Sequence, residues 1–194
     1  MPCPVTFPSD LHWSRSQGSA NLAWVLPALL ACGAPRVVAE IGVCEGFTTE
    51  VLIRALEDLG GGRLVSVDTN PYSCAVARGV SEGLPVGHTV LQCDSRTMDW
   101  TGLVGKNGLG LALVDGDHEE ASALADLNAI APAVAPGGFV VVHDYAPGLP
   151  GPMRAVATFL ETHKDWGRIV LAELVEPRSM RTAVLQNQEG LCLK

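Results

Sequence analysis

Short apolar segments alternate with amphipathic segments along almost the whole 194-residue chain. Seven of the apolar segments are rich in β-branched residues and have the length of a buried strand. They cover residues 36–43, 63–68, 88–94, 110–115, 139–144, 167–175 and 181–188. Continuous apolar strands that alternate with helices predict an α/β fold, with a mainly parallel sheet and helices on both of its faces.

The amphipathic segments between these strands have the spacing of helices. The predicted helices cover residues 14–33, 48–60, 71–83, 119–138 and 151–163. Ser16 or Ser19 is a suitable cap for the first helix, and Gly33 a suitable end. We expect Pro136 and Gly137 to stop the fourth helix. The last two strands are close enough in sequence to pair as an antiparallel hairpin.

The chain contains no apparent internal repeat or linker, so we predict a single domain over residues 1–194. Within it, residues 1–13 are Pro-rich and are expected to be irregular, and the first helix falls within 14–34.

The charge balance is 13 basic against 21 acidic residues, a net charge of −8. A phosphate backbone requires a basic stripe, and none is visible, so we expect no nucleic-acid partner. The longest apolar run, "LAWVLPALLACGAP", is too short to span a bilayer and contains Pro27, so we expect no membrane association. The six cysteines form no CxxC pair and have no zinc spacing, which favours a reduced, cytoplasmic protein.

Acidic residues follow most of the predicted parallel strands. They are Glu40, Asp68, Asp94, Asp115 and Asp144. In open parallel sheets ligands bind beyond the carboxyl ends of the strands, so these acids are expected at a ligand site.

The turn after the first strand, "AEIGVCEGFTT", contains Gly42 and Gly46 but lacks the GxGxxG fingerprint of dinucleotide-binding folds. Glu40 and Glu45 flank this turn and would repel a pyrophosphate at the helix N-terminus. S-adenosylmethionine carries a sulfonium and an ammonium and no phosphate, so the acids favour it as the cofactor. A nucleotide-dependent oxidoreductase remains the alternative.

Other predicted cofactor contacts lie at the next strand ends. Asp68 is placed to accept hydrogen bonds from ribose hydroxyls, although it could instead cap the following helix. Asp94 and Ser95 are placed to reach the adenine edge, although a simple turn would also explain them. The remaining predicted cofactor contacts are Thr48 and Thr69, which lie next to these turns, and Asp115.

Four segments resemble, in order and spacing, the motifs of class I S-adenosylmethionine-dependent methyltransferases. They are "VVAEIGVCEGFTTEVLIRAL", "LVSVDTNP", "LALVDGDH" and "PGGFVVVHDY". Within that class the pattern is most similar to the small metal-dependent O-methyltransferases. These are the catechol and caffeoyl-CoA type and the related bacterial group that methylates sugars and natural products.

The resemblance spans roughly residues 14–188 and implies a doubly wound, Rossmann-like sheet with one antiparallel strand in the C-terminal hairpin. It implies that the helix within 14–34 covers the active site and that a small-molecule hydroxyl accepts the methyl group. Many relatives are homodimers, so a homodimer is also expected. A non-catalytic module that binds S-adenosylmethionine is a further alternative.

The resemblance also implies a metal site. Asp115 stands where the family has a metal-binding aspartate, and His143 and Asp144 stand where it has further ligands. The catechol type has Asp-Asn at that pair, so this chain departs from it, and His143 could instead point into the sheet. Neighbouring strands lie about 4.8 Å apart, and two carboxylates that close repel each other unless one is protonated or a cation lies between them.

Carboxylate ligands favour Mg²⁺, and an imidazole would also permit Mn²⁺, Fe²⁺ or Zn²⁺. The alternative is that Asp115 or Asp117 only caps the following helix.

His118 stands three residues after Asp115, where catechol-type enzymes have a catalytic lysine. Histidine titrates near neutral pH, so His118 is a candidate general base alongside Asp115. It could instead orient other groups through a bond to Asp117 or Asp144.

Several weaker candidates lie outside these motifs. Gln17 and Gly18 precede the first helix, and Tyr145 with the loop 146–153 is expected to wall the acceptor pocket. Trp13 and Trp100 could stack on adenine or on an acceptor, although a core or surface position is the favoured explanation for each.

Overall fold

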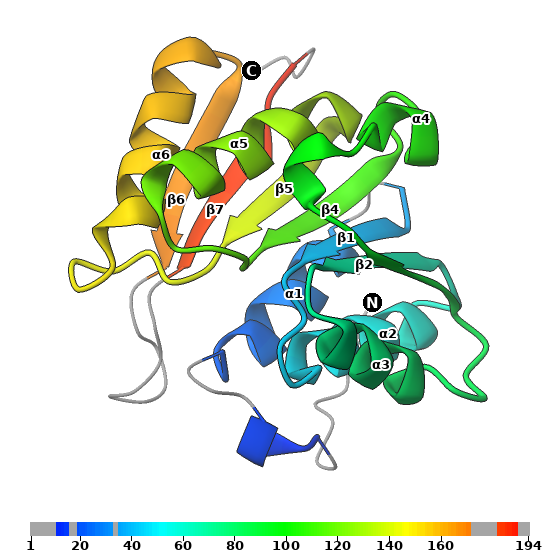
Figure 1. Cartoon of the computed structure of the whole chain (residues 1–194). Coiled ribbons are helices and arrows are strands. Elements are labelled where there is room, and N and C mark those ends of the chain that lie inside the picture. The colour runs from blue at the N-terminus through cyan, green and yellow to red at the C-terminus, as the bar shows by residue number, and fades with distance from the viewer. Residues whose placement is uncertain (1–10, 16–18, 33–34, 172–181, 190–194) are drawn as a thin grey trace.

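The computed structural model describes residues 11–15, 19–32, 35–171 and 182–189. These residues form one seven-stranded sheet with strand order β3-β2-β1-β4-β5-β7-β6 (Figure 1). The strands are β1 Val37–Ile41, β2 Arg63–Asp68, β3 Gly87–Gln92, β4 Leu109–Val114, β5 Val134–Val142, β6 Trp166–Leu171 and β7 Thr182–Asn187. Strands β1 to β5 pair in parallel, and β7 runs antiparallel to both β5 and β6. The predicted mainly parallel sheet with one antiparallel C-terminal strand is confirmed.

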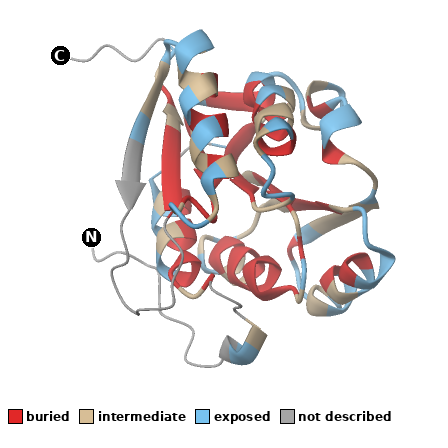
Figure 2. Ribbon diagram, turned by 60° about the vertical axis from the view of Figure 1, so that its left-hand side comes forward, coloured by how far each residue is buried: buried red, intermediate tan, exposed pale blue. Residues whose placement is uncertain are grey.

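Helices cover both faces of the sheet (Figure 1). One face carries α1 Leu22–Ala31, α2 Phe47–Asp58 and α3 Pro71–Val80, and the other carries α4 Trp100–Val104, α5 Glu120–Ile130 and α6 Pro150–Thr162. Short 3₁₀ turns are η1 Trp13–Arg15, η2 Ser95–Thr97 and η3 Ala131–Ala133. Figure 2 shows buried residues in the central strands and along parts of the helices packed against them.

Strand β4 lies between two apolar cores. Leu111 and Leu113 pack with residues of α1 and α2, whereas Ala112 and Val114 pack with residues of α5 and α6. All four side chains are at most 3% exposed. This burial on both faces explains why the strand is continuously apolar rather than alternating.

The strand order reverses between β1 and β4. From β1 the chain continues outward through β2 and β3, and it then returns to place β4 on the other side of β1. A sheet that reverses in this way opens a crevice at the carboxyl ends of the two central strands. The Asp115 N–H donates to the Ile41 carbonyl at 2.9 Å, which holds the two strand ends together.

The first helix is shorter than predicted. Residues 13–15 form η1, and α1 begins only at Leu22, after a turn in which the Leu22 N–H donates to the Ser19 carbonyl at 2.9 Å. Asn21 at the N-cap makes no capping bond, and its side-chain amide donates to Thr182 Oγ1 on β7 at 3.0 Å. Ser16 lies outside the described residues, and Ser19 does not cap the helix.

The predicted helix 119–138 is also wrong at its end. Helix α5 stops at Ile130, Pro132 lies in η3, and β5 already begins at Val134. Pro136 and Gly137 therefore lie inside a strand, where the pairing with β4 shifts register between Leu109 and Leu111. Proline and a positive-φ glycine are compatible with such an irregularity, so they mark a bulge here instead of a helix stop.

The other predicted elements are present, with their ends moved by a few residues. The prediction missed α4, which is too short to show helical periodicity. Its Trp100 is 1% exposed and donates through Nε1 to the Ser95 carbonyl at 3.3 Å, so this ring belongs to the core. Residues 172–175 and 181 of the last two predicted strands lie outside the described residues.

Within the described part of the chain, no helix has the length and apolar character needed to cross a membrane. Cys32, Cys44, Cys74 and Cys93 are free thiols.

We predict that Leu113→Ala lowers the free energy of unfolding by about 2–5 kcal/mol, because it leaves a cavity in the centre of the sheet. The matched control is Leu84→Ala, since Leu84 is 38% exposed and its loss leaves no enclosed cavity. Urea denaturation measures both. Equal losses in the two variants would contradict the core position of Leu113.

Candidate active site

Two adjoining cavities open at the carboxyl ends of the central strands. The β2–β4 cavity has a volume of about 410 Å³ and includes Asp68, Asp94 and Asp115 in its wall. The β4–β5 cavity has a volume of about 260 Å³ and includes Asp115, His118 and Asp144. The residues common to both walls are Gly42, Cys44, Asp115 and Gly116. A ligand that bridges the two cavities must therefore pass over the first turn.

The first turn has an unusual backbone. Gly42, Cys44 and Gly46 all have positive φ, at 87°, 51° and 76°. A Cβ on Gly42 would lie 2.0 Å from the Asp115 carbonyl oxygen, so only glycine fits. The Val43 N–H donates to Asp68 Oδ2 at 2.9 Å. The turn thus brings the ends of β1, β2 and β4 together.

Glu40 lies beneath this turn and is fully buried. Three hydroxyls donate to its carboxylate: Thr48 at 2.6 Å, Thr49 at 2.8 Å and Ser66 at 2.6 Å. Burial raises the pKa of Glu40 to about 7, although these hydrogen bonds lower it. The carboxylate fastens the start of α2 to β1 and β2 and is not part of either cavity wall.

Asp68 closes the floor of the β2–β4 cavity. Besides the Val43 bond, its Oδ1 accepts from the Asn70 N–H at 2.8 Å. The cap of α3 is Asn70, whose side chain accepts from Tyr72 N–H, so the alternative role of Asp68 as the cap is wrong. Thr69 lies next to Asp68 in the same wall and is exposed.

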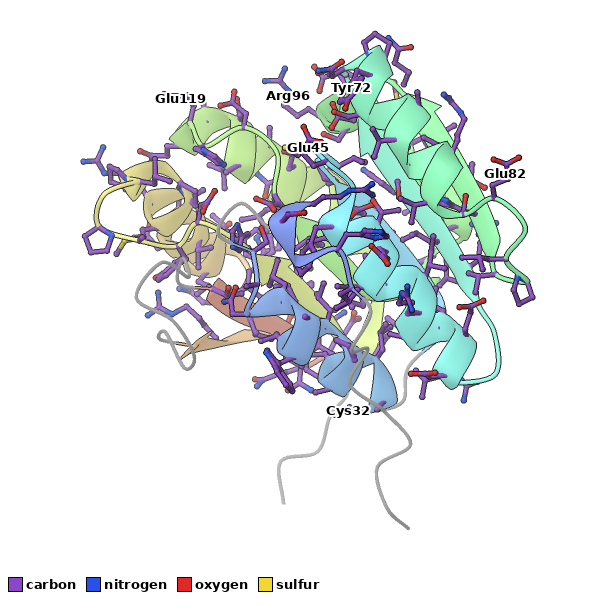
Figure 3. All side chains as sticks on the ribbon, turned by 90° about the horizontal axis from the view of Figure 1, so that it is seen from below. Cys32, Glu45, Tyr72, Glu82, Arg96 and Glu119 are labelled. Atoms are coloured by element: carbon purple, nitrogen blue, oxygen red, sulfur yellow. The ribbon has the colours of Figure 1, made fainter. Side chains whose placement is uncertain are left out.

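Asp94 is paired with Arg96. The guanidinium donates to Oδ1 through Nε at 2.8 Å and to Oδ2 through Nη2 at 2.7 Å. These bonds hold the pKa of Asp94 below its usual range. Ser95 is buried and donates to Asp126 Oδ1 at 2.6 Å. Figure 3 shows Arg96, Glu45 and Glu119 toward one side of the molecule and Cys32 at the opposite side.

The β4–β5 cavity brings together the ends of β4 and β5. His143 Nδ1 lies 3.2 Å from Asp115 Oδ1 and 3.3 Å from Asp144 Oδ1, and its side chain is 2% exposed. Burial disfavours the charged imidazole, but hydrogen bonds and attraction from the two carboxylates outweigh burial and raise the pKa of His143 to about 10. His143 therefore lies behind the two acids and bridges them.

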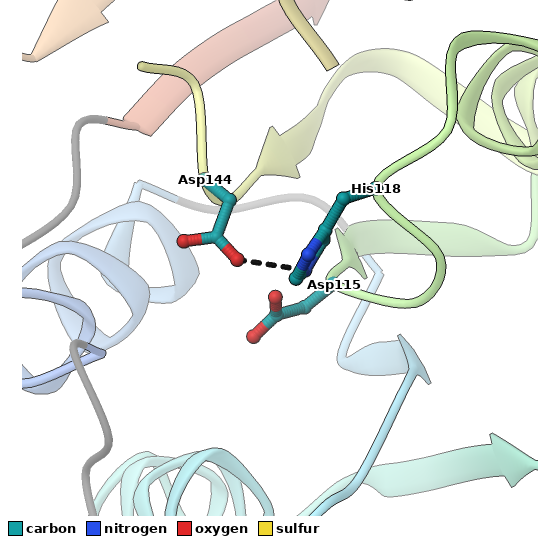
Figure 4. A group of neighbouring side chains, drawn as sticks. All are labelled: Asp115, His118 and Asp144. Carbon is teal, nitrogen blue, oxygen red and sulfur yellow. Dashed lines mark ion pairs between the residues drawn. The ribbon is translucent and has the colours of Figure 1, made fainter. Parts of the chain in front are cut away.

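His118 approaches the same acids from the loop after β4. Its Nε2 lies 2.7 Å from Asp144 Oδ2, and its side chain is 45% exposed (Figure 4). The sequence left Asp117 and Asp144 as alternative partners of His118, and the structure shows the contact with Asp144. A Cβ on Gly151 would lie 1.9 Å from the His118 carbonyl oxygen, so the first turn of α6 packs directly on this loop. That contact fixes the backbone that carries His118.

Asp115, His118 and Asp144 each offer one ligand atom, and these atoms lie within 4.8 Å of one another (Figure 4). The predicted metal set named His143 in place of His118. The geometry groups His118 with the two acids, and His143 contacts the same acids from the buried side.

The remaining predicted residues are spread over the site. Glu45 and Thr48 line the β4–β5 cavity, and Gly46 is the N-cap residue of α2. Tyr145 is 7% exposed, and its hydroxyl accepts from Arg168 Nη1 at 2.9 Å, so it packs in the core below α6. Gln17, Gly18 and the side chain of Trp13 lie outside what the structure describes.

Sequence reasoning missed several polar cavity residues, among them Arg15, Arg96, Ser122 and Asp126. None of these four follows a predicted strand directly, so strand-end position gave no signal for them. The one available signal was the charge of Asp126 on the apolar side of a predicted helix.

A family model described as a methyltransferase domain matches residues 39–145, from β1 to the residue after Asp144. The chain belongs to this methyltransferase family. Comparison with curated protein sequences finds no match.

Solved structures of methyltransferases share the fold. The O-methyltransferase TomG from Streptomyces achromogenes, involved in tomaymycin synthesis and solved with SAM, is 17% identical with a TM-score of 0.69, over 94% of this chain and 91% of TomG. An O-methyltransferase from Bacillus cereus in complex with SAH is 16% identical with a TM-score of 0.67, over 87% and 81%. An rRNA methylase from Streptococcus thermophilus is 11% identical with a TM-score of 0.64, over 84% and 94%. These likenesses show the class I methyltransferase fold.

We predict that Gly42→Ala destabilises this methyltransferase more than Gly60→Ala does. Both positions have nearly the same φ, 87° and 84°, but the nearest atom to a Cβ on Gly60 is 3.7 Å away. Gly60→Ala should cost about 1–2 kcal/mol of unfolding free energy from strain alone. Gly42→Ala should cost about 1–3 kcal/mol more, because it also forces β1 and β4 apart. Equal costs in denaturant titrations would contradict the close approach.

We predict a pH-dependent contribution from Glu40. Its pKa rises from 4.5 to about 7 on folding, so between these values the folded protein holds a proton that the unfolded chain has released. The contribution of Glu40 to unfolding free energy therefore falls as pH rises through that window.

Subtracting the unfolding free energy of Glu40→Gln from that of the wild type isolates this effect, because other groups titrate in both proteins. The difference should fall by about 3 kcal/mol across the window. Parallel stability curves for the two proteins would contradict a proton on Glu40.

Proposed function

We propose that this methyltransferase transfers a methyl group from S-adenosylmethionine to a hydroxyl of a small molecule, with a divalent metal at the acceptor site. The observation that carries the proposal is the pair of adjoining acidic cavities that share Asp115. One has the room and polarity for a nucleoside, and the other contains a histidine and two carboxylates in mutual reach.

The charges at the site suit S-adenosylmethionine. Asp68 accepts two backbone N–H bonds, yet a carboxylate has about four acceptor positions, so it can also accept from ribose hydroxyls. Glu45 and Asp115 favour a ligand with a sulfonium and an ammonium over one with phosphates. The SAM complex of TomG and the SAH complex of the Bacillus cereus enzyme support the same cofactor.

In this arrangement the adenosine occupies the β2–β4 cavity, and the methionine portion passes Gly42 toward the β4–β5 cavity. The bound cofactor supplies the methyl group as an electrophile. The chain's own contribution is to hold an acceptor oxygen in line with the methyl group and the sulfur.

The donor set fits a divalent cation. Asp115 and Asp144 emerge from neighbouring strands, and their repulsion is partly offset by His143 behind them and His118 beside them. Two carboxylates suit Mg²⁺ and would leave His118 free to act as a base. Mn²⁺, Fe²⁺ or Zn²⁺ could also take the His118 imidazole as a ligand, in which case His118 would not be the base. A bound ion would lower the pKa of the acceptor hydroxyl and orient it. His143, which bridges both acids, is then a positioning residue and not a ligand.

His118 is the proposed general base. It lines the β4–β5 cavity and is half-exposed, so an acceptor hydroxyl can reach it. Its pairing with Asp144 orients the ring and stabilises the positive charge that forms when it takes the hydroxyl proton.

The acceptor is proposed to be a sugar, a phenol or another small natural product. The cavity of about 260 Å³ has room for a small molecule, and the net charge of −8 disfavours nucleic acid. Because an rRNA methylase shares the fold, the fold alone does not decide the acceptor. A homodimer is part of the same proposal.

We predict that Asp68→Ala weakens binding of S-adenosylmethionine by about 1.5–3 kcal/mol, roughly 10- to 150-fold, the range for a charge-assisted hydrogen bond. Glu161→Ala is the matched control, since it removes the same charge from an exposed position on α6. Fluorescence titration measures both. An unchanged affinity in Asp68→Ala would remove Asp68 from the site.

We predict that Asp144→Asn and His118→Ala each lower the rate of methyl transfer at least 100-fold, while the affinity for S-adenosylhomocysteine stays within about threefold of wild type. Asp144→Asn should also abolish stimulation by Mg²⁺. The assay is transfer of a labelled methyl group to a panel of hydroxyl acceptors. Wild-type rates with full metal stimulation in Asp144→Asn would overturn the metal proposal.

A further inference from the structure

A buried carboxylate on α5 faces the β2–β4 cavity. Asp126 lies in the wall of that cavity and is 3% exposed. Its Oδ1 accepts from Ser95 Oγ at 2.6 Å. Its Oδ2 lies 3.6 Å from the point where a Cβ on Gly116 would stand, so this oxygen is directed over the Gly116 backbone at the end of β4.

Asp94, the acid that the strand pattern assigns to the adenine edge, is already engaged. Its Oδ1 accepts from the Arg96 N–H at 3.0 Å and from Nε at 2.8 Å, and its Oδ2 accepts from Nη2 at 2.7 Å. Three donors from one arginine hold this carboxylate against η2. Asp126 has no comparable arginine clamp among the described residues, and it lies deeper in the same wall.

Asp126 lies in the same cavity wall as Asp68, so a ligand held by Asp68 can extend toward it. Cys93 and Ser95 line the same cavity, and Asp126 accepts from Ser95 Oγ. We expect a ribose held by Asp68 to direct its base along this wall. A buried carboxylate that accepts a single side-chain bond requires a further donor, because an unsatisfied buried charge is costly.

We propose that Asp126 accepts a hydrogen bond from the exocyclic amino group of the cofactor's adenine and thereby selects a 6-aminopurine. This inference rests on the proposed use of S-adenosylmethionine and names the residue that reads its base. An ionised carboxylate only accepts hydrogen bonds. A 6-amino group donates to it, whereas a 6-oxo group places a second acceptor against it and is rejected.

The surroundings of Asp126 affect its ionisation. Burial, with the charges of Asp94 and Asp117, raises the pKa of Asp126, and the Ser95 bond and the Arg96 charge oppose that rise only in part. A hydrogen bond donated by the adenine would also lower the pKa of Asp126 and so favour its ionised form.

The test compares two ligands that differ only at position 6 of the purine, S-adenosylhomocysteine and S-inosylhomocysteine, by calorimetric titration. The wild-type protein should bind the 6-amino ligand at least 100-fold more tightly. Asp126→Asn should reduce that ratio below tenfold, mainly by gaining affinity for the 6-oxo ligand, because an amide both donates and accepts.

Glu161→Gln is the matched control. It makes the same acid-to-amide change at an exposed position on α6, so both affinities and their ratio should stay near the wild-type values. Thermal unfolding establishes that each variant is folded.

The outcomes separate this inference from the proposed function. A wild-type protein that binds both ligands equally well would overturn the role of Asp126 and leave the cofactor proposal intact. Equal weakening of both ligands in Asp126→Asn would also overturn it, because a purely structural residue behaves in that way. No binding of S-adenosylhomocysteine to folded wild-type protein would overturn the proposed function itself. If Asp126→Asn does not fold, Asp126→Ser takes its place in the same comparison, and an unchanged ratio in a folded Asp126→Ser would overturn the inference.

Discussion

The backbones of β1 and β4 meet at a point where no side chain fits. The Asp115 carbonyl oxygen occupies the space that a Cβ on Gly42 would need, and the Asp115 N–H bonds to the Ile41 carbonyl. Because the strand order reverses between these two strands, this contact defines the crevice at the sheet edge. The two cavities lie on either side of it and share Gly42 and Asp115 in their walls.

The negative charges of the acids around this contact are stabilised by different partners. Glu40 is buried beneath three hydroxyls, Asp94 is clamped by Arg96, and Asp115 and Asp144 share His143. Within the described residues, the Asp68 carboxylate accepts from two backbone N–H groups and keeps acceptor capacity toward the cavity. The edge of the sheet is therefore not uniformly available to a ligand. The groups that remain open are the Asp68 carboxylate, for which we propose a ribose contact, and the proposed cation site of Asp115, His118 and Asp144.

Much of the fold follows from local sequence, because the central strands contain short apolar runs and most of them end at or near an ionisable residue. For the same reason Asp68, Asp115 and Asp144 could be assigned to one edge of the sheet from the order of the strands along the chain. The ends of α1 and α5 could not be predicted, since Asn21 is used in a bond to Thr182 on β7 and Pro136 sits in a strand bulge. Both depend on residues far away in sequence.

Individual roles within the site were harder to predict than its location. Glu40 is the one acid inside the apolar run of β1, and the neighbouring threonines of α2 were a signal that it is buried and hydrogen-bonded. The choice between His118 and His143 depends on which ring is exposed, and only the packing of α6 against the loop decides that.

The most direct test of this account is calorimetric titration of S-adenosylmethionine into metal-stripped wild-type protein, repeated with Mg²⁺. The account predicts saturable binding at one site per chain in both conditions, because the acids of the β2–β4 cavity recognise the cofactor without the metal. Absence of binding to the folded protein in both conditions would contradict it.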